Sequence, residues 1–116
     1  ERFCLNLMGD GAFGMSGTDI ETAVRAEVPI TTVVLNNGGM STYPGGFPTA
    51  RKQYGVSAMY GNYAQIAEGM GAVGLVVESP TGLIDALKSA QHLNKEGKTV
   101  LVDVHSNMES LRSRWN

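Results

Sequence analysis

The sequence predicts an α/β fold, with an open and mostly parallel sheet covered by helices on both faces. Four short apolar segments have the pattern of strands, and a helical pattern lies between each strand and the next. Parallel strands need such crossovers, because the chain must return to the same end of the sheet before the next strand begins. The 116 residues, of which 42% are hydrophobic, suffice for one compact unit of this kind.

The first half of the chain predicts two strands with one helix between them. Segment 2–8 (RFCLNLM) is largely apolar and predicts the first strand, in which Cys4 is expected to be a buried core residue. After a glycine-rich turn, the Thr18–Glu21 capping-box pattern opens a helix over 18–26. The β-branched run 30–35 (ITTVVL) then predicts a strand that is buried on both faces.

The second half begins with an irregular loop over 36–54, which is rich in Gly, Pro and Tyr, and loops of this length usually carry function. Asn62 and Ser79 stand where they can cap two further helices, and Pro80 suits the first turn of the second one. The remaining elements are expected to be a helix over 63–70, a strand over 73–77, a helix over 80–94 and a strand over 99–104.

Composition and charge disfavour several classes of partner. The net charge of −2 provides no basic field for nucleic acid, and no apolar run approaches the roughly 20 residues that span a bilayer. The N-terminus lacks a signal-peptide layout, and Cys4 is the single cysteine, which excludes an internal disulfide. We therefore expect a cytoplasmic protein with no nucleic-acid or membrane partner. Because a strand pattern starts at once, we also expect the chain to be one segment of a larger protein.

The glycine-rich turn matches a nucleotide-binding pattern by spacing alone. Gly9, Gly11 and Gly14 spell G-x-G-x-x-G, the dinucleotide fingerprint. A dinucleotide site also needs an acidic residue at the end of the second strand, to bind the ribose hydroxyls. That strand ends in Asn36-Asn37, and no acidic residue occurs between Glu27 and Glu68. A nicotinamide site is therefore disfavoured.

The same turn fits a metal–diphosphate site better. Asp10 lies just beyond the end of the first predicted strand, and Asn37 lies just beyond the end of the second. Ligands of such sheets bind beyond the carboxyl ends of the strands. Mg²⁺ takes oxygen ligands, typically one or two carboxylates together with substrate phosphates. Gly11 and Ala12 lead toward a helix N-terminus, where N–H groups bind diphosphates. Either half alone favours a simple glycine turn in which Asp10 caps the following helix, but both halves together favour the metal site.

The segment from Gly9-Asp10-Gly11 to Asn36-Asn37 resembles the thiamine diphosphate (ThDP) motif, which begins with Gly-Asp-Gly and ends in Asn-Asn. Asn36 is expected to hold the loop by hydrogen bonding. The resemblance implies that the ligands of Mg²⁺ are Asp10, Asn37 and the carbonyl oxygen of Gly39. It implies that the diphosphate is held by Gly9, Gly11, Ala12 and the turn around Met40.

The whole chain resembles most of the C-terminal, diphosphate-binding domain of the acetolactate synthase, oxalyl-CoA decarboxylase and 2-hydroxyacyl-CoA lyase group. Segment 12–25 (AFGMSGTDIETAVR) is most similar to the lyases and oxalyl-CoA decarboxylases, although those lyases often have Ser or Ala at position 11. The resemblance implies a ThDP- and Mg²⁺-dependent enzyme, leaning to cleavage of a 2-hydroxyacyl-CoA into formyl-CoA and an aldehyde or ketone. The alternatives are acetolactate synthase-like decarboxylation and ligation of 2-keto acids, or a non-catalytic diphosphate-binding module.

In this group the cofactor performs the chemistry, and a glutamate of a pyrimidine-binding domain assists its deprotonation. The resemblance places that domain and a central domain outside this chain, so the catalytic residues are unknown and the segment alone is expected to be inactive. The implied partners are the rest of the enzyme and a small-molecule substrate, either an acyl-CoA or a 2-keto acid. A homo-oligomer, dimer or tetramer, is expected because family active sites lie between domains of different subunits.

Other side chains have two interpretations each. Tyr43, Phe47 and Tyr54 either line a substrate pocket or pack within their own loop. His105 ends the last predicted strand at the ligand edge, where an exposed histidine without a role is the simpler interpretation. The segment Arg112–Trp115 either meets CoA phosphates or forms a solvated tail.

Overall fold

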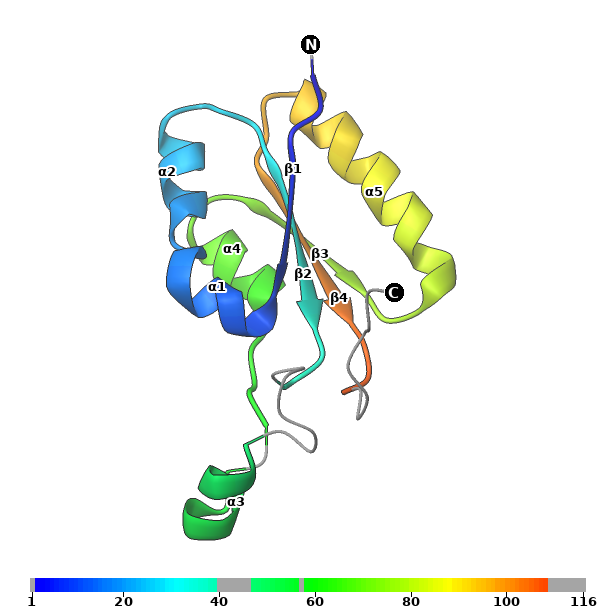
Figure 1. Cartoon of the computed structure of the whole chain (residues 1–116). Helices are drawn as coiled ribbons and strands as arrows, with labels where there is room; N and C mark the ends of the chain where they lie inside the picture. Colours follow the sequence, from blue (N-terminus) through cyan, green and yellow to red (C-terminus); the bar gives the residue numbers. More distant parts are fainter. Residues whose placement is uncertain (1, 40–46, 57, 109–116) are drawn as a thin grey trace, which may run out of the picture.

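The computed structural model describes residues 2–39, 47–56 and 58–108, which form one parallel sheet with helices around it (Figure 1). The strands are β1 (Leu5–Gly9), β2 (Thr31–Asn36), β3 (Val73–Val77) and β4 (Val100–His105). Their order in the sheet is β1-β2-β4-β3, and every neighbouring pair runs parallel. The predicted open parallel sheet is confirmed, and the strand limits differ from the predicted ones by three residues at most.

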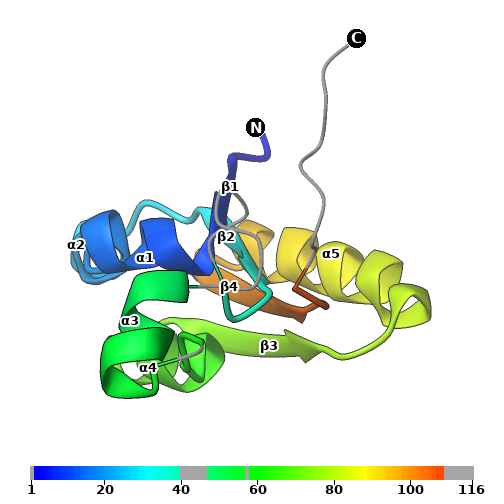
Figure 2. The same cartoon turned by 60° about the horizontal axis from the view of Figure 1, so that its bottom comes forward.

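Helices cover both faces of this sheet (Figure 2). The described residues form α1 (Asp10–Ser16), α2 (Asp19–Arg25), α3 (Pro48–Tyr54), α4 (Tyr63–Gly69) and α5 (Pro80–Lys95). Helices α1, α2 and α4 lie on one face and α5 lies on the other, while α3 projects beyond the carboxyl ends of the strands (Figures 1 and 2). This arrangement leaves the carboxyl edge of the sheet bordered by loops.

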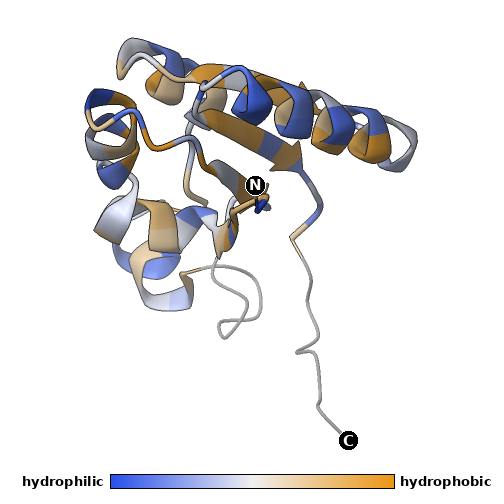
Figure 3. Cartoon of the chain, turned by 90° about the horizontal axis from the view of Figure 1, so that it is seen from above, coloured by the Kyte–Doolittle hydropathy of each residue, from blue (hydrophilic) through white to orange (hydrophobic). Residues whose placement is uncertain are grey.

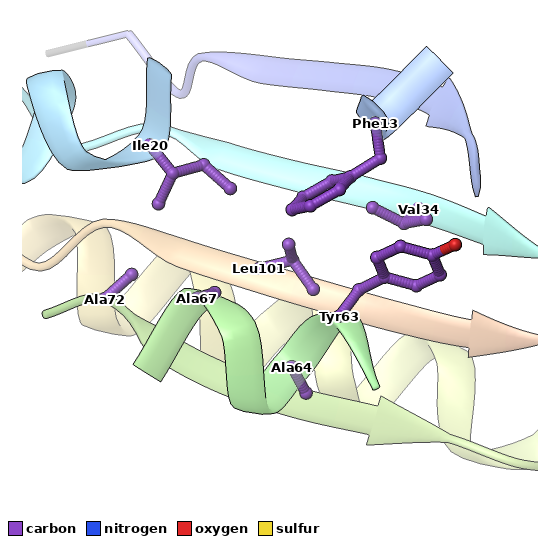
Figure 4. Packing of buried hydrophobic residues seen from close by; sticks show 8 residues of the cluster. All are labelled: Phe13, Ile20, Val34, Tyr63, Ala64, Ala67, Ala72 and Leu101. Atoms are coloured by element: carbon purple, nitrogen blue, oxygen red, sulfur yellow. The ribbon is translucent and has the colours of Figure 1, made fainter. Parts of the chain in front are cut away.

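Each face of the sheet has its own apolar core. Under α1, α2 and α4, the buried side chains are Phe13, Ile20, Val34, Tyr63, Ala64, Ala67, Ala72 and Leu101 (Figure 4). Under α5 they are Val33, Val77, Ala90, Val100 and Val102. The alternation of strand side chains explains the division, because successive residues point to opposite faces. Even-numbered β2 residues and odd-numbered β4 residues therefore face α4.

Helix α5 covers only part of its face. Hydrophobic and hydrophilic residues alternate along this helix (Figure 3), and its Leu83, Leu87 and Leu93 pack against the core under it. The edge strand β1 is left open on this side, and Leu5 and Leu7 remain 48% and 60% exposed. Cys4, which we expected in the core, is also exposed. That expectation was wrong because Cys4 lies before an edge strand, where burial is incomplete.

Two helices occur where the sequence predicted turn or loop. The glycine-rich segment after β1 forms α1, which is stabilised by burial of Phe13 and by an acidic residue, Asp10, in its first turn. The end of the predicted 36–54 loop forms α3, with Pro48 at its first position and Gly55 in the left-handed conformation after its last residue. The sequence did not predict α1, because its glycines lower the helix propensity of the segment. The burial of Phe13 compensates for this loss in the folded protein.

The expected capping box at Thr18 does not form. Thr18 has helical backbone angles and its side chain makes no cap hydrogen bond. Helices α1 and α2 are nearly continuous, so the N–H groups of Ile20 and Glu21 donate instead to the carbonyls of Gly17 and Thr18. The Glu21 side chain pairs with Arg25, at 3.0 Å from its Nε.

The two caps of the second half have different outcomes. The Asn62 cap of α4 is confirmed, because its Oδ1 accepts from the Gln65 N–H at 2.9 Å. Ser79 is the residue before α5, but its hydroxyl pairs with that of Thr81 rather than with the helix backbone. Among the described helices, none is long and apolar enough to cross a membrane.

Candidate functional site

The ends of β1 and β2 meet at the carboxyl edge of the sheet, around the Asp10 side chain. Asp10 is the first residue of α1, directly after β1, and only 5% of it is exposed. Its Oδ2 accepts the N–H of Gly38 at 2.7 Å, and its Oδ1 accepts the N–H of Gly11 at 2.8 Å. The two halves of the predicted motif are therefore in direct contact.

The chain after β2 turns sharply beside Asp10. The Asn37 Oδ1 accepts the N–H of Gly39 at 2.9 Å, a local side-chain turn that asparagine favours. Gly38 has a φ of +71°, which glycine adopts without the strain that other residues incur. Gly39 is buried, and a Cβ there would meet the Met108 side chain at 2.6 Å. The turn thus places one amide and one buried glycine close to a carboxylate.

Asn36 fixes the start of this turn, as the sequence predicted. Its Nδ2 donates to the carbonyl oxygen of Gly61 at 3.1 Å and to the Asp103 Oδ1 at 3.0 Å. Its own carbonyl oxygen accepts the N–H of Ser106 at 2.9 Å. The end of β2 is therefore tied to β4 and to the segment that precedes α4.

Asp103 is a residue that the sequence reasoning missed. It lies in the middle of β4, is fully buried, and its Oδ2 accepts the N–H of Tyr63 at 3.0 Å. One sequence signal marks it, namely an acidic residue inside the apolar run TVLVDV. A buried carboxylate needs strong hydrogen-bond partners, so such a residue in a core strand indicates a built polar site.

Tyr63 lies at the inner boundary of the site. Its ring packs against Phe13, with centroids 4.8 Å apart (Figure 4). Burial raises the pKa of its phenol above the ordinary value, and the negative charges of Asp10 and Asp103 raise that pKa further. The phenol therefore stays protonated beside two carboxylates.

An open groove of about 400 Å³ lies next to the turn, at the ends of β2 and β4. Its lining includes Asn37, Gly38, Tyr60, His105 and Ser106. The His105 Nε2 lies 3.7 Å from the Asp103 Oδ2, and its Nδ1 lies 3.9 Å from the Glu78 Oε1. The groove gives a ligand access to the edge of the sheet where the motif residues meet.

The oxygen atoms at this edge suit a hard cation that is shared with a phosphate. Within the described residues, no group of three or more His, Cys, Asp or Glu side chains is placed to bind a metal. A cation here would need amide and backbone carbonyl oxygens and further oxygens from a ligand, which is the habit of Mg²⁺ with phosphates. Each Asp10 oxygen accepts one N–H and retains a second lone pair for a cation. The donor set therefore fits Mg²⁺.

Several predicted residues lie apart from the edge or outside the described residues. Phe47 lines a separate pocket at the start of α3 with Pro48, and Tyr54 is 77% exposed at its end. Neither contributes to the groove beside the turn. Of the residues singled out in the sequence, Met40, Tyr43 and Arg112–Trp115 lie outside the described ranges.

Residues 1–104 match the sequence model of a protein family described as "Thiamine pyrophosphate enzyme, C-terminal TPP binding domain". An acetolactate synthase of Bacillus subtilis (strain 168) is 41% identical over 104 residues, which are 86% of this chain and 17% of that protein. The 2-hydroxyacyl-CoA lyase 2 of Mus musculus is 32% identical over 107 residues, which are 90% of this chain and 17% of that protein. The chain thus spans less than a fifth of the length of these curated relatives.

Solved structures agree with the sequence comparisons on the fold. A ThDP-dependent 4-hydroxybenzoylformate decarboxylase of Rhodococcus jostii RHA1 superposes with a TM-score of 0.77, at 24% identity over 96% of this chain and 21% of that one. A benzoylformate decarboxylase from Polynucleobacter necessarius gives a TM-score of 0.76, at 24% identity over 97% of this chain and 21% of that one. At such identity the likeness establishes the fold alone. The family match over nearly the whole chain decides the assignment: this chain belongs to the C-terminal TPP-binding domain family of thiamine pyrophosphate enzymes.

Proposed function

We propose that this chain supplies the metal–diphosphate anchor of a ThDP- and Mg²⁺-dependent enzyme that breaks or forms carbon–carbon bonds. The observation that carries the proposal is the contact between the two halves of the motif, the 2.7 Å hydrogen bond from the Gly38 N–H to Asp10. A glycine turn without a ligand requires no meeting of a nearly buried carboxylate with the loop of the next strand. Ligation of one cation by Asp10 and by residues after β2 needs these two segments to lie side by side, and this hydrogen bond holds them there.

The proposed roles follow from the chemistry of each group. Asp10 contributes the anionic oxygen to Mg²⁺, Asn37 an amide oxygen and Gly39 a backbone carbonyl oxygen. Local hydrogen bonds already orient the Asp10 and Asn37 side chains. The proposed contacts to the diphosphate come from Gly9, Gly11, Ala12 and Met40.

The cofactor, when bound, supplies the carbanion and electron-sink chemistry at its thiazolium ring. The work of this chain is to hold the diphosphate end and fix its position relative to the sheet. We place the glutamate that activates the cofactor in a pyrimidine-binding domain outside this chain, so the chain alone is inactive. The complete enzyme is a cytoplasmic homo-oligomer, dimer or tetramer, in this proposal.

The preferred reaction is cleavage of a 2-hydroxyacyl-CoA to formyl-CoA and an aldehyde or ketone. Its support is the segment 12–25, which is similar to such lyases, together with the 2-hydroxyacyl-CoA lyase 2 relative. The second candidate is decarboxylation and ligation of 2-keto acids. The higher identity of the acetolactate synthase relative, 41% against 32%, favours this candidate.

An activity comparison on the full-length protein separates these candidates. With ThDP and Mg²⁺ present, we expect formation of formyl-CoA from a 2-hydroxyacyl-CoA and slower or no condensation of pyruvate. Activity with pyruvate alone would reject the preferred reaction. Cofactor binding without turnover of either substrate would instead indicate a non-catalytic diphosphate-binding module. The variant Asp10→Ala is expected to be inactive in both assays, whereas Asp19→Ala, which removes an exposed aspartate in the first turn of α2, should retain activity.

A further inference from the structure

We infer that Asp103 is a positioning residue for the proposed metal site, acting through Asn36 on the turn of residues 37–39. The starting observation is its burial. Asp103 has no exposed surface, although it is an acidic residue in the centre of the sheet, paired with Val34 of β2 and Val76 of β3. Burying a carboxylate is unfavourable unless hydrogen bonds compensate, so its partners indicate what it does.

Asp103 accepts two hydrogen bonds, and the His105 Nε2 lies farther away, at 3.7 Å from its Oδ2. The Asn36 Nδ2 donates to one carboxylate oxygen at 3.0 Å, and the Tyr63 N–H donates to the other at 3.0 Å. A carboxylate offers two acceptor atoms, whereas an asparagine at the same place offers one acceptor and one donor. Asp103 is therefore matched to its surroundings by its chemistry as well as by its size, and the isosteric amide would oppose one of the two donors.

The hydrogen bonds lead from Asp103 to the turn. Asn36, held by Asp103 and by the carbonyl oxygen of Gly61, directly precedes Asn37. Two residues after Asn36, the Gly38 N–H meets the Asp10 carboxylate. The Gly38 carbonyl oxygen accepts the Met59 N–H at 2.8 Å, which ties the same turn to the segment before α4. Loss of the Asp103 acceptor removes one of the two side-chain hydrogen bonds that hold Asn36 and so loosens the start of this turn.

A purely structural role of Asp103 would lower the stability of the fold without changing the turn or the metal affinity. The bond from the Tyr63 N–H also joins Asp103 to the first residue of α4, so any substitution here lowers stability. A control is available in the buried hydrogen bond between the Thr31 Oγ1 and the Asn94 Oδ1, 2.8 Å long. Thr31 lies at the opposite end of β2 and is equally buried. Thr31→Val therefore removes a comparable buried polar contact far from the turn.

The inference rests on the proposed function only for its metal readout, so the test has two readouts. The full-length proteins Asp103→Asn, Asn36→Ala and Thr31→Val are compared with wild type. Hydrogen–deuterium exchange without metal or ThDP reports the Gly38 and Gly39 amides directly. Titration with Mn²⁺ in the presence of ThDP, followed by electron paramagnetic resonance, reports metal affinity. Asn36→Ala decides the question if Asp103→Asn fails to fold.

We expect Asp103→Asn and Asn36→Ala to accelerate exchange in the turn and to weaken Mn²⁺ binding by about 10- to 100-fold, the usual effect of removing a group that orients a metal ligand. Thr31→Val should leave both readouts at wild-type values. Wild-type exchange and affinity in the Asp103→Asn and Asn36→Ala proteins would overturn the inference. Absence of Mn²⁺ binding in the wild-type protein would contradict the proposed function instead, and the exchange readout would still decide the role of Asp103.

Discussion

The Gly38 N–H donates to the Asp10 Oδ2 at 2.7 Å, and this hydrogen bond joins the ends of two strands that a helical crossover separates in the sequence. The donor is the backbone of a turn and the acceptor is a side chain of which 5% is exposed. Hydrogen bonds from both halves of the motif therefore orient the Asp10 carboxylate. Such prior orientation of ligand atoms is what a metal–diphosphate site needs.

Substitution of Gly38 should affect both stability and the proposed metal binding. Its φ of +71° imposes strain of about 1 kcal/mol or more on an alanine, and an added Cβ would lie 3.4 Å from the Met59 carbonyl oxygen. Gly55 has the same φ of +71° and open space around its Cβ position. We predict that Gly38→Ala and Gly55→Ala lower thermal stability alike, but that Gly38→Ala alone weakens Mg²⁺-dependent ThDP binding, as measured by calorimetry. Equal ThDP affinities in both variants would contradict this prediction.

The close approach of β3 to α4 predicts opposite effects for two glycines. A Cβ at Gly74 would lie 2.5 Å from the backbone oxygen of Ala64. The clash is with backbone atoms, so only a shift of α4 or β3 could relieve it. Gly74→Ala should destabilise the fold by about 1–3 kcal/mol, as overpacking does. Gly69, the last residue of α4, has open space around its Cβ position, so Gly69→Ala should stabilise through helix propensity, by less than the roughly 1 kcal/mol of a helix interior. Urea midpoints measured by circular dichroism test the pair, and two effects of the same sign would refute it.

Helix capping gives a second matched pair. The Asn62 side chain accepts a bond from the Gln65 N–H, whereas the Thr18 side chain makes no cap bond. We expect Asn62→Ala to cost about 1 kcal/mol and Thr18→Ala to cost distinctly less. Thermal unfolding of the two variants measures the difference. A larger loss at Thr18 would show that the capping box forms after all.

Stability at alkaline pH should depend on Tyr63. Burial, together with Asp10 and Asp103, raises the pKa of its phenol in the folded state. Below about pH 10 the phenol is protonated in the folded and unfolded states, so it adds no pH dependence there. As pH rises from about 10 toward the folded pKa, the unfolded chain releases a proton that the folded chain retains, and stability falls. Tyr63→Phe should reduce this fall in the urea midpoint, and an unchanged decline in the variant would disprove the assignment.

The sequence predicted the sheet well because parallel strands leave a strong pattern. Segment 73–77 was placed without error, and the β-branched runs before Asn36 and His105 agree with β2 and β4 to within one residue. The failures concern elements whose stability comes from distant contacts. Helix α1 contains Gly11 and Gly14, which lower its helix propensity, and the packing of Phe13 against Tyr63 of α4 contributes to its stability.

The positions of the candidate site residues were predictable in part for the same reason. Asp10 directly follows β1, and the Asn36-Asn37 pair lies at the end of β2, so topology alone brings these residues to one edge. The partners of these residues depend on three-dimensional geometry. No local sequence pattern predicts the hydrogen bond between Asn36 and Asp103 or the one between Gly38 and Asp10. The only sequence signal for Asp103 is that it is an acidic residue within an apolar run, TVLVDV.

The central claim is that Asp10 anchors a cation that binds ThDP by its diphosphate. Calorimetric titration of the full-length protein with ThDP, with and without Mg²⁺, tests it most directly when wild type, Asp10→Ala and Asp19→Ala are compared. We predict tight ThDP binding that requires Mg²⁺ in wild type and in Asp19→Ala. In Asp10→Ala we predict a loss of ThDP affinity of at least about 100-fold, which is more than the loss of a group that only orients a metal ligand would cause. Binding that is unchanged in Asp10→Ala, or that is independent of Mg²⁺ in wild type, would contradict the claim.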